Sequence, residues 1–268
     1  FPRRAIRTAG TVKPQLPSLF NLNGRIAVVT GGSSGIGQAI GGFLAQAGAQ
    51  VILVARRPDR LDAAVAAIRS GGGDAAAVVV DLDERDHLPK IAAQCQDLFG
   101  HPHILVNAAG VNLREAAEEV TPKSWDQTIR LNLSTPFFLA QALVPGMKEA
   151  GYGRIINIAS LQSVRAFPDG IAYGASKGGV CQLTRAMAEA WSAHGITCNA
   201  IAPGFFPTEL TAPVFDDSER RDWAANQTAM GRNGELEDLA GISVFLAAPA
   251  SGYITGQTIF VDGGFTAK

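Results

Sequence analysis

The sequence predicts a single α/β domain built on a parallel sheet of seven strands, with helices on both faces. Short apolar runs alternate along the chain with amphipathic runs at helical spacing, which is the pattern of strand–helix–strand units. A glycine-rich turn joins the first strand to the first helix. The length of 268 residues, of which 47% are hydrophobic and 18% charged, is sufficient for one large core.

The glycine-rich turn at 30–37 reads Thr-Gly-Gly-Ser-Ser-Gly-Ile-Gly and follows an apolar, β-branched run at 26–29. After it, Ile40, Phe43 and Leu44 continue an apolar stripe at helical spacing. Backbone N–H groups and the positive end of a helix dipole face an anion at such a turn. A Cβ there would collide with phosphates, so the glycines favour a dinucleotide pyrophosphate. The expected contacts are Gly31, Ser33, Ser34, Gly35, Ile36 and Gly37.

Two other interpretations of this turn stay open from the pattern alone. A strand-to-helix turn also uses glycine for positive φ without binding any ligand. Residues 31–35 fit the G-x-S-x-G pattern of a hydrolase nucleophile as well. That nucleophile follows a strand that others already flank, whereas only one strand candidate comes before this turn.

The remaining elements follow in strict alternation. Further strands are predicted over 50–55, 75–80, 104–107, 154–159, 195–202 and 257–261, and helices over 58–70, 84–99, 124–148, 172–193 and 235–247. A TIM barrel would need eight strands. We therefore predict a doubly wound, Rossmann-like sheet, in which ligands bind beyond the carboxyl ends of the strands, where the strand order reverses.

The domain proper is predicted to span 20–268. Residues 1–19 carry four basic residues, three prolines and no acidic residue, and are expected to be an arm: disordered, a remnant of a targeting peptide, or left from expression. A net charge of −1 and the lack of a long apolar run argue against nucleic-acid and membrane partners. Three cysteines without metal-site spacing indicate free thiols, and we expect no metal and a cytoplasmic protein, with mitochondria as the alternative that the arm suggests.

The residues that follow the second, third and fourth strands indicate the cofactor. Arg56 and Arg57 stand where a carboxylate would bind an adenosine 2′-hydroxyl, and guanidinium groups bind phosphate instead, which favours NADP(H) over NAD(H). Arg57 precedes a proline and is expected to point outward, so Arg56 is the stronger candidate. Asp81 is a candidate acceptor for the adenine amino group, and Asn107 and Gly110 are candidates for close cofactor contact. Turn chemistry alone also explains Asp, Asn and Gly at these positions.

A second cluster follows the fifth strand. Ser160 comes directly after it, and Tyr173 and Lys177 lie four residues apart on the next predicted helix, hence on one face. The ammonium of Lys177 is therefore expected near the phenol of Tyr173. A plain polar pair on a helix is the other interpretation.

These motifs together resemble the short-chain dehydrogenase/reductase family, in register from about residue 20 to 264. The motifs are Thr30-Gly-x-x-x-Gly35-x-Gly37, Asn107-Ala-Ala-Gly110, Asn132, Ser160, Tyr173-x-x-x-Lys177 and Pro203-Gly204-x-x-x-Thr208. Three segments, at 159–163, 201–209 and 260–264, are similar to the gluconate 5-dehydrogenase branch of that family.

The resemblance implies hydride transfer between a nicotinamide and a carbonyl or alcohol carbon, with Tyr173 as general acid/base. A free phenol has a pKa of about 10, so this role needs a shift of roughly 3 units. The Lys177 ammonium about 4 Å away would supply that in a sheltered cleft, with an oxidised nicotinamide ring adding positive charge. The resemblance also implies that Ser160 donates to the developing alkoxide and that Asn132, within the long helix, holds a water linked to Lys177. Tyr173 and Lys177 are expected to contact the cofactor as well. By the same resemblance, the nicotinamide is held by Pro203, Gly204, Phe206 and Thr208. A homo-oligomer, dimer or tetramer, is expected.

The substrate is less legible than the cofactor. Residues 205–227 are rich in aromatic residues and are expected to form a substrate lid. Candidate contacts are Arg114, which could bind a carboxylate, together with Gln162 and Phe205. We expect a small-molecule carbonyl or alcohol, namely a keto-sugar, keto-gluconate or related polyol. A 3-oxoacyl thioester or bulky ketone is the alternative, and a non-catalytic dinucleotide-binding protein is the remote one.

Overall fold

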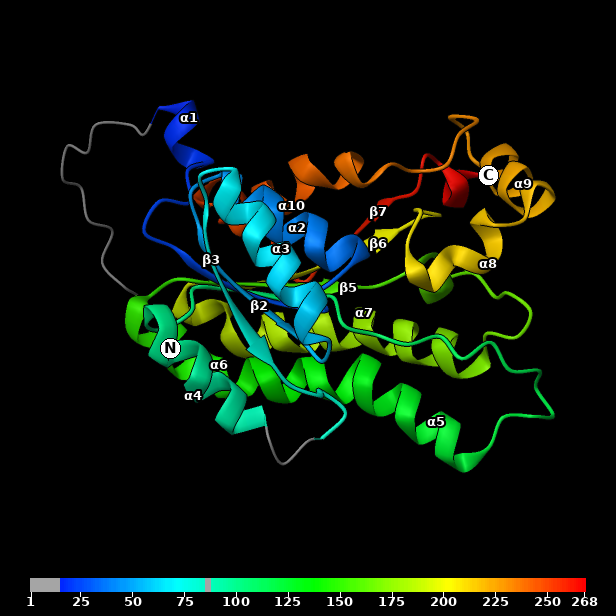
Figure 1. The fold of residues 1–268 in the computed structure, drawn as a ribbon, viewed down its shortest axis with the longest axis horizontal. Helices are drawn as coiled ribbons and strands as arrows, with labels where there is room; N and C mark the ends of the chain where they lie inside the picture. Colours follow the sequence, from blue (N-terminus) through cyan, green and yellow to red (C-terminus); the bar gives the residue numbers. More distant parts are fainter. Residues whose placement is uncertain (1–14, 85–87) are drawn as a thin grey trace.

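The computed structural model describes residues 15–84 and 88–268, and within them the seven predicted strands form one parallel sheet. The strand order is β3-β2-β1-β4-β5-β6-β7 (Figure 1). The strands are β1 Ile26–Thr30, β2 Gln50–Ala55, β3 Asp74–Val79, β4 Ile104–Asn107, β5 Gly153–Ile158, β6 Ile196–Pro203 and β7 Thr258–Val261. Each lies within one residue of its predicted position at either end, because apolar runs of this kind are buried on both faces of a parallel sheet.

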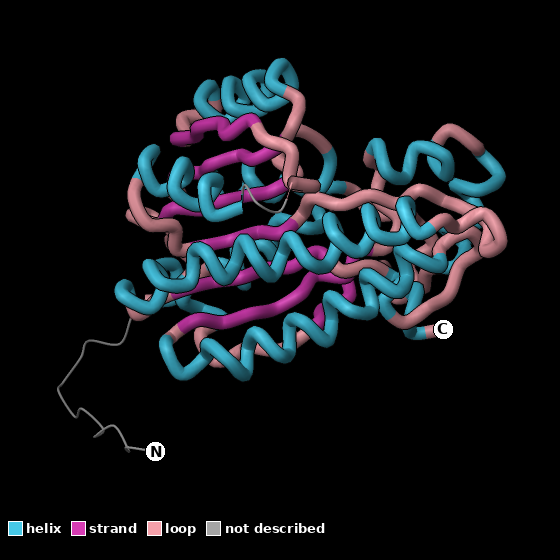
Figure 2. Tube along the Cα trace, turned by 90° about the horizontal axis from the view of Figure 1, so that it is seen from below, coloured by secondary structure: helices cyan, strands magenta, loops and turns pink. Residues whose placement is uncertain are grey.

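Helices cover both faces of the sheet (Figure 2). One face carries α2 Gly35–Gln46, α3 Pro58–Ser70 and α10 Ala240–Ala247; the other carries α4 Leu88–Phe99, α5 Pro122–Ile129, α6 Thr135–Ala150 and α7 Ile171–Trp191. Each face has its own core: Leu44 and Leu53 are fully buried in the first, and Leu105 and Leu139 in the second. The short α1 Leu16–Leu19 precedes the sheet, so part of the predicted arm is helical; residues 1–14 lie outside the described residues.

The helix predicted over 124–148 is interrupted in the structure. Arg130–Ser134 form a π-helical turn between α5 and α6. Pro136 has no N–H to donate to the carbonyl of Asn132 four residues earlier, and its ring crowds that carbonyl, so a regular α-helix cannot continue here. The turn directs Asn132 inward, where the residue is buried.

The sheet places its reversal of strand order between β1 and β4. Strand β1 pairs with β2 on one side and with β4 on the other. After β1 the chain continues to β2 on one side of the sheet, and after β4 it continues to β5 on the opposite side. Thr30 joins their carboxyl ends, because its hydroxyl oxygen accepts hydrogen bonds from the backbone N–H groups of Ala108 and Ala109, each 3.1 Å away. The cleft expected for a doubly wound sheet therefore opens above β1 and β4.

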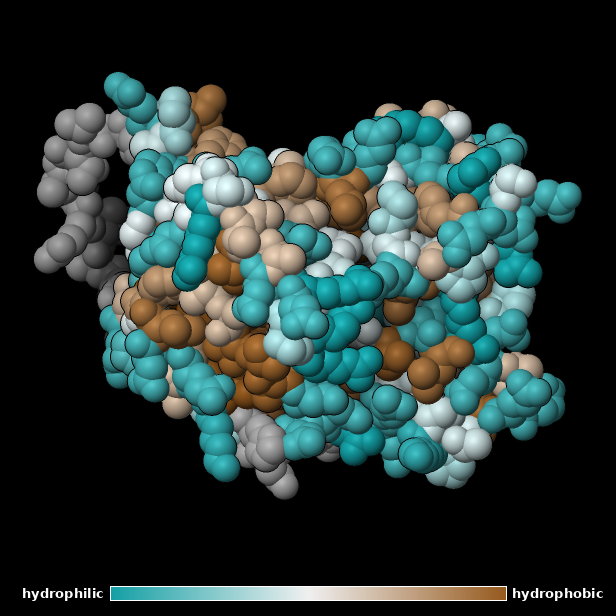
Figure 3. All heavy atoms as spheres, viewed as in Figure 1, coloured by the Kyte–Doolittle hydropathy of each residue, from teal (hydrophilic) through white to brown (hydrophobic). Residues whose placement is uncertain are grey.

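The outer surface is mixed in character. On the face shown in Figure 3, hydrophilic side chains predominate, and hydrophobic ones gather where the edge strand β3 meets α4. Val79 at the end of β3 is about half exposed. Within the described ranges, no helix has the length and apolar character needed to cross a membrane.

Candidate active site

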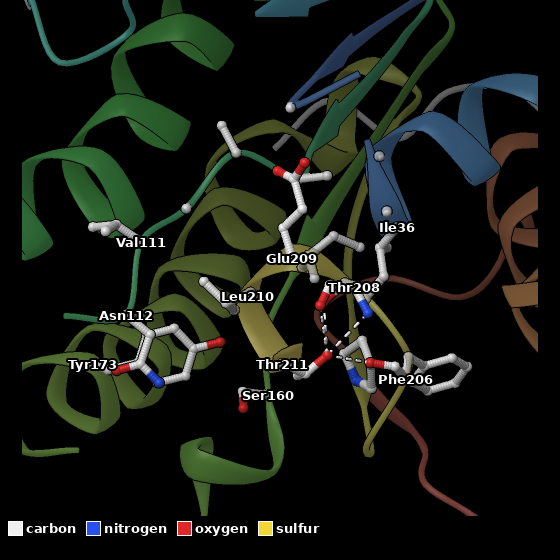
Figure 4. Close-up of a pocket in the computed structure, with 18 of the residues that line it drawn as sticks. Ile36, Val111, Asn112, Ser160, Tyr173, Phe206, Thr208, Glu209, Leu210 and Thr211 are labelled. Atoms are coloured by element: carbon white, nitrogen blue, oxygen red, sulfur yellow. Dashed lines mark hydrogen bonds between the residues drawn. The ribbon is translucent and has the colours of Figure 1, made fainter. Parts of the chain in front are cut away.

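A cleft of about 990 Å³ lies at the carboxyl ends of the strands, where the reversal of strand order places it (Figure 4). Its volume is in the range of small-molecule and cofactor sites. Most of the residues predicted for the site line it: Gly31, Ser33, Ser34, Gly35, Ile36, Gly37, Arg56, Arg57, Asp81, Gly110, Arg114, Ser160, Gln162, Tyr173, Lys177, Pro203, Gly204, Phe205, Phe206 and Thr208. Residues more than 150 positions apart in the sequence thus meet in one place.

Asn107 is a correction to the predicted set. It is buried beneath the cleft and does not line it; its amide donates to Asn157 Oδ1 at 2.9 Å, and Asn157 in turn donates to Thr184 Oγ1 at 2.9 Å. This network crosses from β4 to β5 and α7. Asn107 therefore supports the floor of the cleft rather than touching its contents.

Asn132 also lies behind the wall of the cleft, and its side chain fixes the loop after β4. Its Oδ1 accepts from the N–H of Val111 at 2.8 Å, and its Nδ2 donates to the carbonyl of Val111 at 2.9 Å and to Ser176 Oγ at 3.1 Å. A Cβ on Gly110 would come within 3.2 Å of that Oδ1. The loop after β4 is thus held close to α7 by one amide.

Backbone conformation and close packing within the protein both favour glycine in the turn. Gly31 and Gly35 have φ of +67° and +55°, which disfavours other residues. A Cβ on Gly31 would lie 2.9 Å from the backbone nitrogen of Ala109, and one on Gly37 would lie 2.4 Å from the carbonyl oxygen of Gly31. Gly31 and Gly37 are thus needed for close packing of the turn against the β4 loop and of α2 against the turn; their expected closeness to phosphates stays a prediction.

The two arginines after β2 behave differently from the prediction. Arg57, expected to point outward, lies over the glycine turn and donates to Ser34 Oγ at 3.0 Å and to Ser33 Oγ at 3.4 Å. The side chain of Arg56 is 73% exposed and lies 3.9 Å from a carboxylate oxygen of Asp81. Both cations stand at the same end of the cleft, and Arg57 is the more firmly held.

Sequence reasoning missed Glu209, which follows β6 and reaches across the glycine turn. Its carboxylate pairs with Arg57 at 2.8 Å, accepts a hydrogen bond from Ser34 Oγ at 3.3 Å and pairs closely with Arg60. The hydrogen bond from Arg57 holds the pKa of Glu209 below its ordinary value. No local sequence pattern predicts these contacts, because Arg57 is 152 residues and Ser34 is 175 residues away from Glu209 in the chain.

Ser160 and Tyr173 meet at the inner wall of the cleft (Figure 4). Ser160 lies two residues after the end of β5 and has an extended backbone. It is the N-cap of a short 3₁₀ turn, and its Oγ accepts a hydrogen bond from the N–H of Gln162 at 3.1 Å. Tyr173, the third residue of α7, is buried. Burial raises the pKa of Tyr173, while the Ser160 hydroxyl and the charge of Arg114 act in the opposite direction. At neutral pH the phenol is therefore protonated.

Lys177 lies one helical turn beyond Tyr173, as the spacing predicts. Its Nζ stands 5.6 Å from the centroid of the Tyr173 ring and donates to the carbonyl of Ile158 at 2.6 Å. Burial lowers the pKa of Lys177 to about 8. Burial is the largest influence on the pKa of Tyr173 and raises it, so a lowering of that pKa by Lys177 stays a prediction.

Aromatic side chains form the outer end of the cleft. Phe205 contacts Phe167 and Trp223 edge-on, with ring centroids 6.1 and 6.3 Å apart. The segment that carries Phe205 and Trp223 was predicted as a lid at 205–227, and it consists of a 3₁₀ turn and the helices α8 Ala212–Phe215 and α9 Ser218–Gln227. Arg114, at φ +54°, donates to the carbonyl of Leu210 at 3.1 Å and so joins the β4 loop to this segment.

Phe206 and Thr208 connect this segment to the rest of the site. Phe206 is buried, and its ring lies where a Cβ on Gly234 would be, so most of its side chain packs in the core. Thr208 contacts Gly35, where a Cβ would lie 3.1 Å from the Thr208 methyl group. Thr211 Oγ1 binds the N–H of Thr208 at 3.0 Å and donates to the carbonyl of Phe206, which fixes the backbone between them (Figure 4).

Metal and thiol chemistry find no support in these side chains. In residues 15–84 and 88–268, no group of three or more His, Cys, Asp or Glu side chains could hold a metal ion. Cys95, Cys181 and Cys198 are free and buried, and burial raises the pKa of the Cys95 and Cys198 thiols to about 12. The phenol of Tyr173, the hydroxyl of Ser160 and the ammonium of Lys177 lie together in the cleft and can donate or accept protons.

The chain is similar in sequence to a family of reductases and to dehydrogenases of gluconate derivatives. A family model described as enoyl-(acyl carrier protein) reductase matches residues 31–266. Gluconate 5-dehydrogenase of Gluconobacter oxydans (strain 621H) is 40% identical over 250 residues, which are 93% of this chain and 98% of that enzyme. 2-Dehydro-3-deoxy-D-gluconate 5-dehydrogenase of Escherichia coli (strain K12) is 40% identical over 256 residues, 94% of this chain and 99% of that enzyme.

A solved structure agrees with the fold over nearly the whole chain. A gluconate 5-dehydrogenase from Burkholderia cenocepacia J2315, in complex with NADP and tartrate, superposes with a TM-score of 0.90 at 37% identity; the match covers 95% of this chain and 100% of that one. The cleft above the reversal of strand order, its Ser, Tyr and Lys side chains, and these matches lead to one conclusion. The chain belongs to the short-chain dehydrogenase/reductase family of oxidoreductases.

Proposed function

We propose that this protein is an NADP(H)-dependent carbonyl reductase or alcohol dehydrogenase acting on a keto-gluconate, keto-sugar or related polyol. One observation carries the proposal: the buried phenol of Tyr173 lines the same cleft as Ser160, Lys177 and the glycine turn at the start of α2. The names of the relatives, two of them dehydrogenases of gluconate derivatives, support the substrate class.

Ser160 and Tyr173 are the residues proposed to act on the substrate oxygen. A bound nicotinamide supplies or accepts the hydride. Ser160 and Tyr173 donate hydrogen bonds to the substrate oxygen, and Tyr173 gives up its phenolic proton as that oxygen becomes an alkoxide in reduction. Because burial raises the pKa of Tyr173, the free protein holds that proton at neutral pH and is ready to act as an acid.

Other residues are proposed to hold the cofactor and relay protons. Arg56 and Arg57 would bind the adenosine 2′-phosphate, and the turn at the start of α2 would bind the pyrophosphate. The backbone carbonyl of Asn132, which Pro136 cannot reach with an N–H, is a suitable acceptor for a water that leads from Lys177 to solvent. A homo-oligomer, dimer or tetramer, stays a prediction.

The arginine roles predict a cofactor-specific effect. In Arg56→Ala and Arg57→Ala, kcat/KM with NADPH should fall about tenfold or more, because each loses a charge-assisted hydrogen bond to phosphate. With NADH, kcat/KM should change less than about twofold, since NADH lacks the 2′-phosphate. Initial rates with both cofactors measure this, and equal losses for the two would remove the 2′-phosphate role.

The aromatic outer end of the cleft favours a second candidate substrate. Phe167, Phe205 and Trp223 offer a larger apolar surface than a polyol needs, and the matching family model is described as an acyl-carrier-protein reductase. A 3-oxoacyl thioester or bulky ketone would use this surface.

A substrate panel followed by NADPH absorbance separates the candidates. We expect 5-ketogluconate or a ketose to give a kcat/KM at least tenfold above that of an acetoacetyl thioester. The reverse order would establish the second candidate. If no carbonyl compound consumes NADPH although NADPH binds, the remote alternative of a non-catalytic dinucleotide-binding protein would stand.

A further inference from the structure

Glu209 places a negative charge on the most cationic corner of the cleft. It sits on the first position of the 3₁₀ turn after β6, and Figure 4 shows its side chain extending away from Ser160 and Tyr173. Its carboxylate contacts Arg57, Arg60 and Ser34 at once. None of the chemistry assigned to Ser160, Tyr173 and Lys177 uses this carboxylate, so its role needs a separate explanation.

The groups around Glu209 form a site for an anion. Two guanidinium groups and one hydroxyl converge on it, and Ser34 is also the N-cap of the 12-residue helix α2, where the helix dipole favours negative charge. The Ser34 side chain makes no capping hydrogen bond to α2 and is turned to the carboxylate instead. The Glu209 carboxylate is ionised at neutral pH, because the hydrogen bond from Arg57 lowers its pKa.

Arg57 is also one of the two groups proposed for the adenosine 2′-phosphate, and it cannot fully serve two anions. Its guanidinium is now shared between Ser33, Ser34 and Glu209. The other arginine, Arg56, is mostly exposed, and its nearest carboxylate oxygen, on Asp81, is 3.9 Å away. A 2′-phosphate approaching Arg56 would therefore meet a second cation that is already neutralised.

We propose that Glu209 is a specificity-determining residue: its carboxylate competes with the 2′-phosphate of NADP(H) for Arg57 and Ser34, and so lowers the preference for NADP(H) over NAD(H). This rests on the proposed function, in which NADP(H) is the cofactor. The side chain is free to leave without unfolding its segment, because the Thr208–Thr211 hydrogen bonds hold the backbone on either side of it. Displacement of Glu209 is then a rotation of one half-exposed side chain.

Glu209→Gln tests the competition, since it removes the charge and keeps the shape. The probes are 2′,5′-ADP, which carries the 2′-phosphate without a pyrophosphate, and 5′-AMP, which lacks it, both titrated calorimetrically in phosphate-free buffer. We expect Glu209→Gln to bind 2′,5′-ADP about three- to tenfold more tightly than the unaltered protein, and 5′-AMP within about twofold of it. The ratio of kcat/KM for NADPH over NADH should rise by a similar factor.

Glu219→Gln is the matched control. Glu219 is an exposed carboxylate on α9 in the same segment, and its side chain makes none of these contacts, so its affinities should not change. Unchanged or weaker binding of 2′,5′-ADP by Glu209→Gln, with thermal stability retained, would overturn the competition; weaker binding would mean that Glu209 positions Arg57 for phosphate. If the unaltered protein binds 5′-AMP and 2′,5′-ADP equally, the proposed NADP(H) preference itself fails, and this is seen before any variant is made.

Discussion

Tyr173→Phe is expected to lower kcat/KM for carbonyl reduction about a thousandfold or more. The variant removes only the phenolic oxygen, which is the group proposed to give its proton to the forming alkoxide, and a well-placed general acid contributes about 10²- to 10⁴-fold. The ring stays and keeps its packing in a buried position of α7. Thermal stability and the dissociation constant for NADP⁺ should therefore change little, which separates loss of chemistry from loss of fold.

Tyr152→Phe provides the matched control. The Tyr152 ring is half-buried and contacts the guanidinium groups of Arg25 and Arg154, and its hydroxyl donates to the carbonyl of Ala247 at 2.7 Å. Neither Tyr152 nor Ala247 lines the cleft. This variant should lose about 1 kcal/mol of unfolding free energy and keep its activity. Full activity in Tyr173→Phe would end the proposed mechanism and favour the non-catalytic alternative.

The pH dependence of the reaction follows from the same residue. Because the pKa of Tyr173 is raised by burial, the free protein keeps the phenol protonated across the neutral range. The pH dependence of kcat/KM reports ionisations of the free protein. Titration of Tyr173 should therefore cause no decrease in kcat/KM for reduction between about pH 6 and 8. Oxidation of the alcohol needs the phenolate and should become faster with rising pH.

Lys177→Met should lower kcat/KM about a hundredfold. At 5.6 Å from the Tyr173 ring, an ammonium stabilises a forming phenolate by about 3 kcal/mol at an effective dielectric of 20. Methionine has a similar length without the charge, so it tests the charge rather than the volume. The loss should be larger for alcohol oxidation, which starts from the phenolate, than for reduction. Equal activity of the variant and the unaltered protein would show that the charge of Lys177 is not used.

Stability as a function of pH gives Lys177 a second, independent signature. Its pKa is lowered from 10.5 to about 8 by burial, so between these values the unfolded chain keeps the proton and the folded chain releases it. The unaltered protein should therefore gain stability relative to Lys177→Met as pH rises from about 8 to 10.5. Lys148→Met, at an exposed site on α6, should keep full activity.

The order of the elements could be predicted from the sequence because each strand is a short apolar run bounded by turn residues. The run at 104–107 and the helix at 58–70 have the predicted bounds in the structure. The π-helical turn at Arg130–Ser134 was missed because apolar periodicity continues through it. Pro136 was the available signal, since a proline removes one donor from the helix and crowds the carbonyl four residues earlier.

The candidate site was predictable where its residues sit at fixed offsets from a strand end. Ser160, Tyr173 and Lys177 are of this kind, and the structure brings them together. Side-chain directions were not predictable in the same way: Arg57 turns inward, and Asn107 turns below the cleft. Glu209 could not be predicted at all, since its partners depend on how the segment after β6 folds back over α2.

The π-helical turn has one more consequence, which concerns alignment of this chain with its relatives. A π turn accommodates a residue more than an α-helical turn does, so a chain shorter by one residue at Arg130–Ser134 would keep α5 and α6 against the sheet. The amide at Asn132 would then no longer face Val111, and the loop after β4 would be released. A single-residue gap at this point therefore matters more for the shape of the binding cavity than many substitutions elsewhere, even when Ser160, Tyr173 and Lys177 all match.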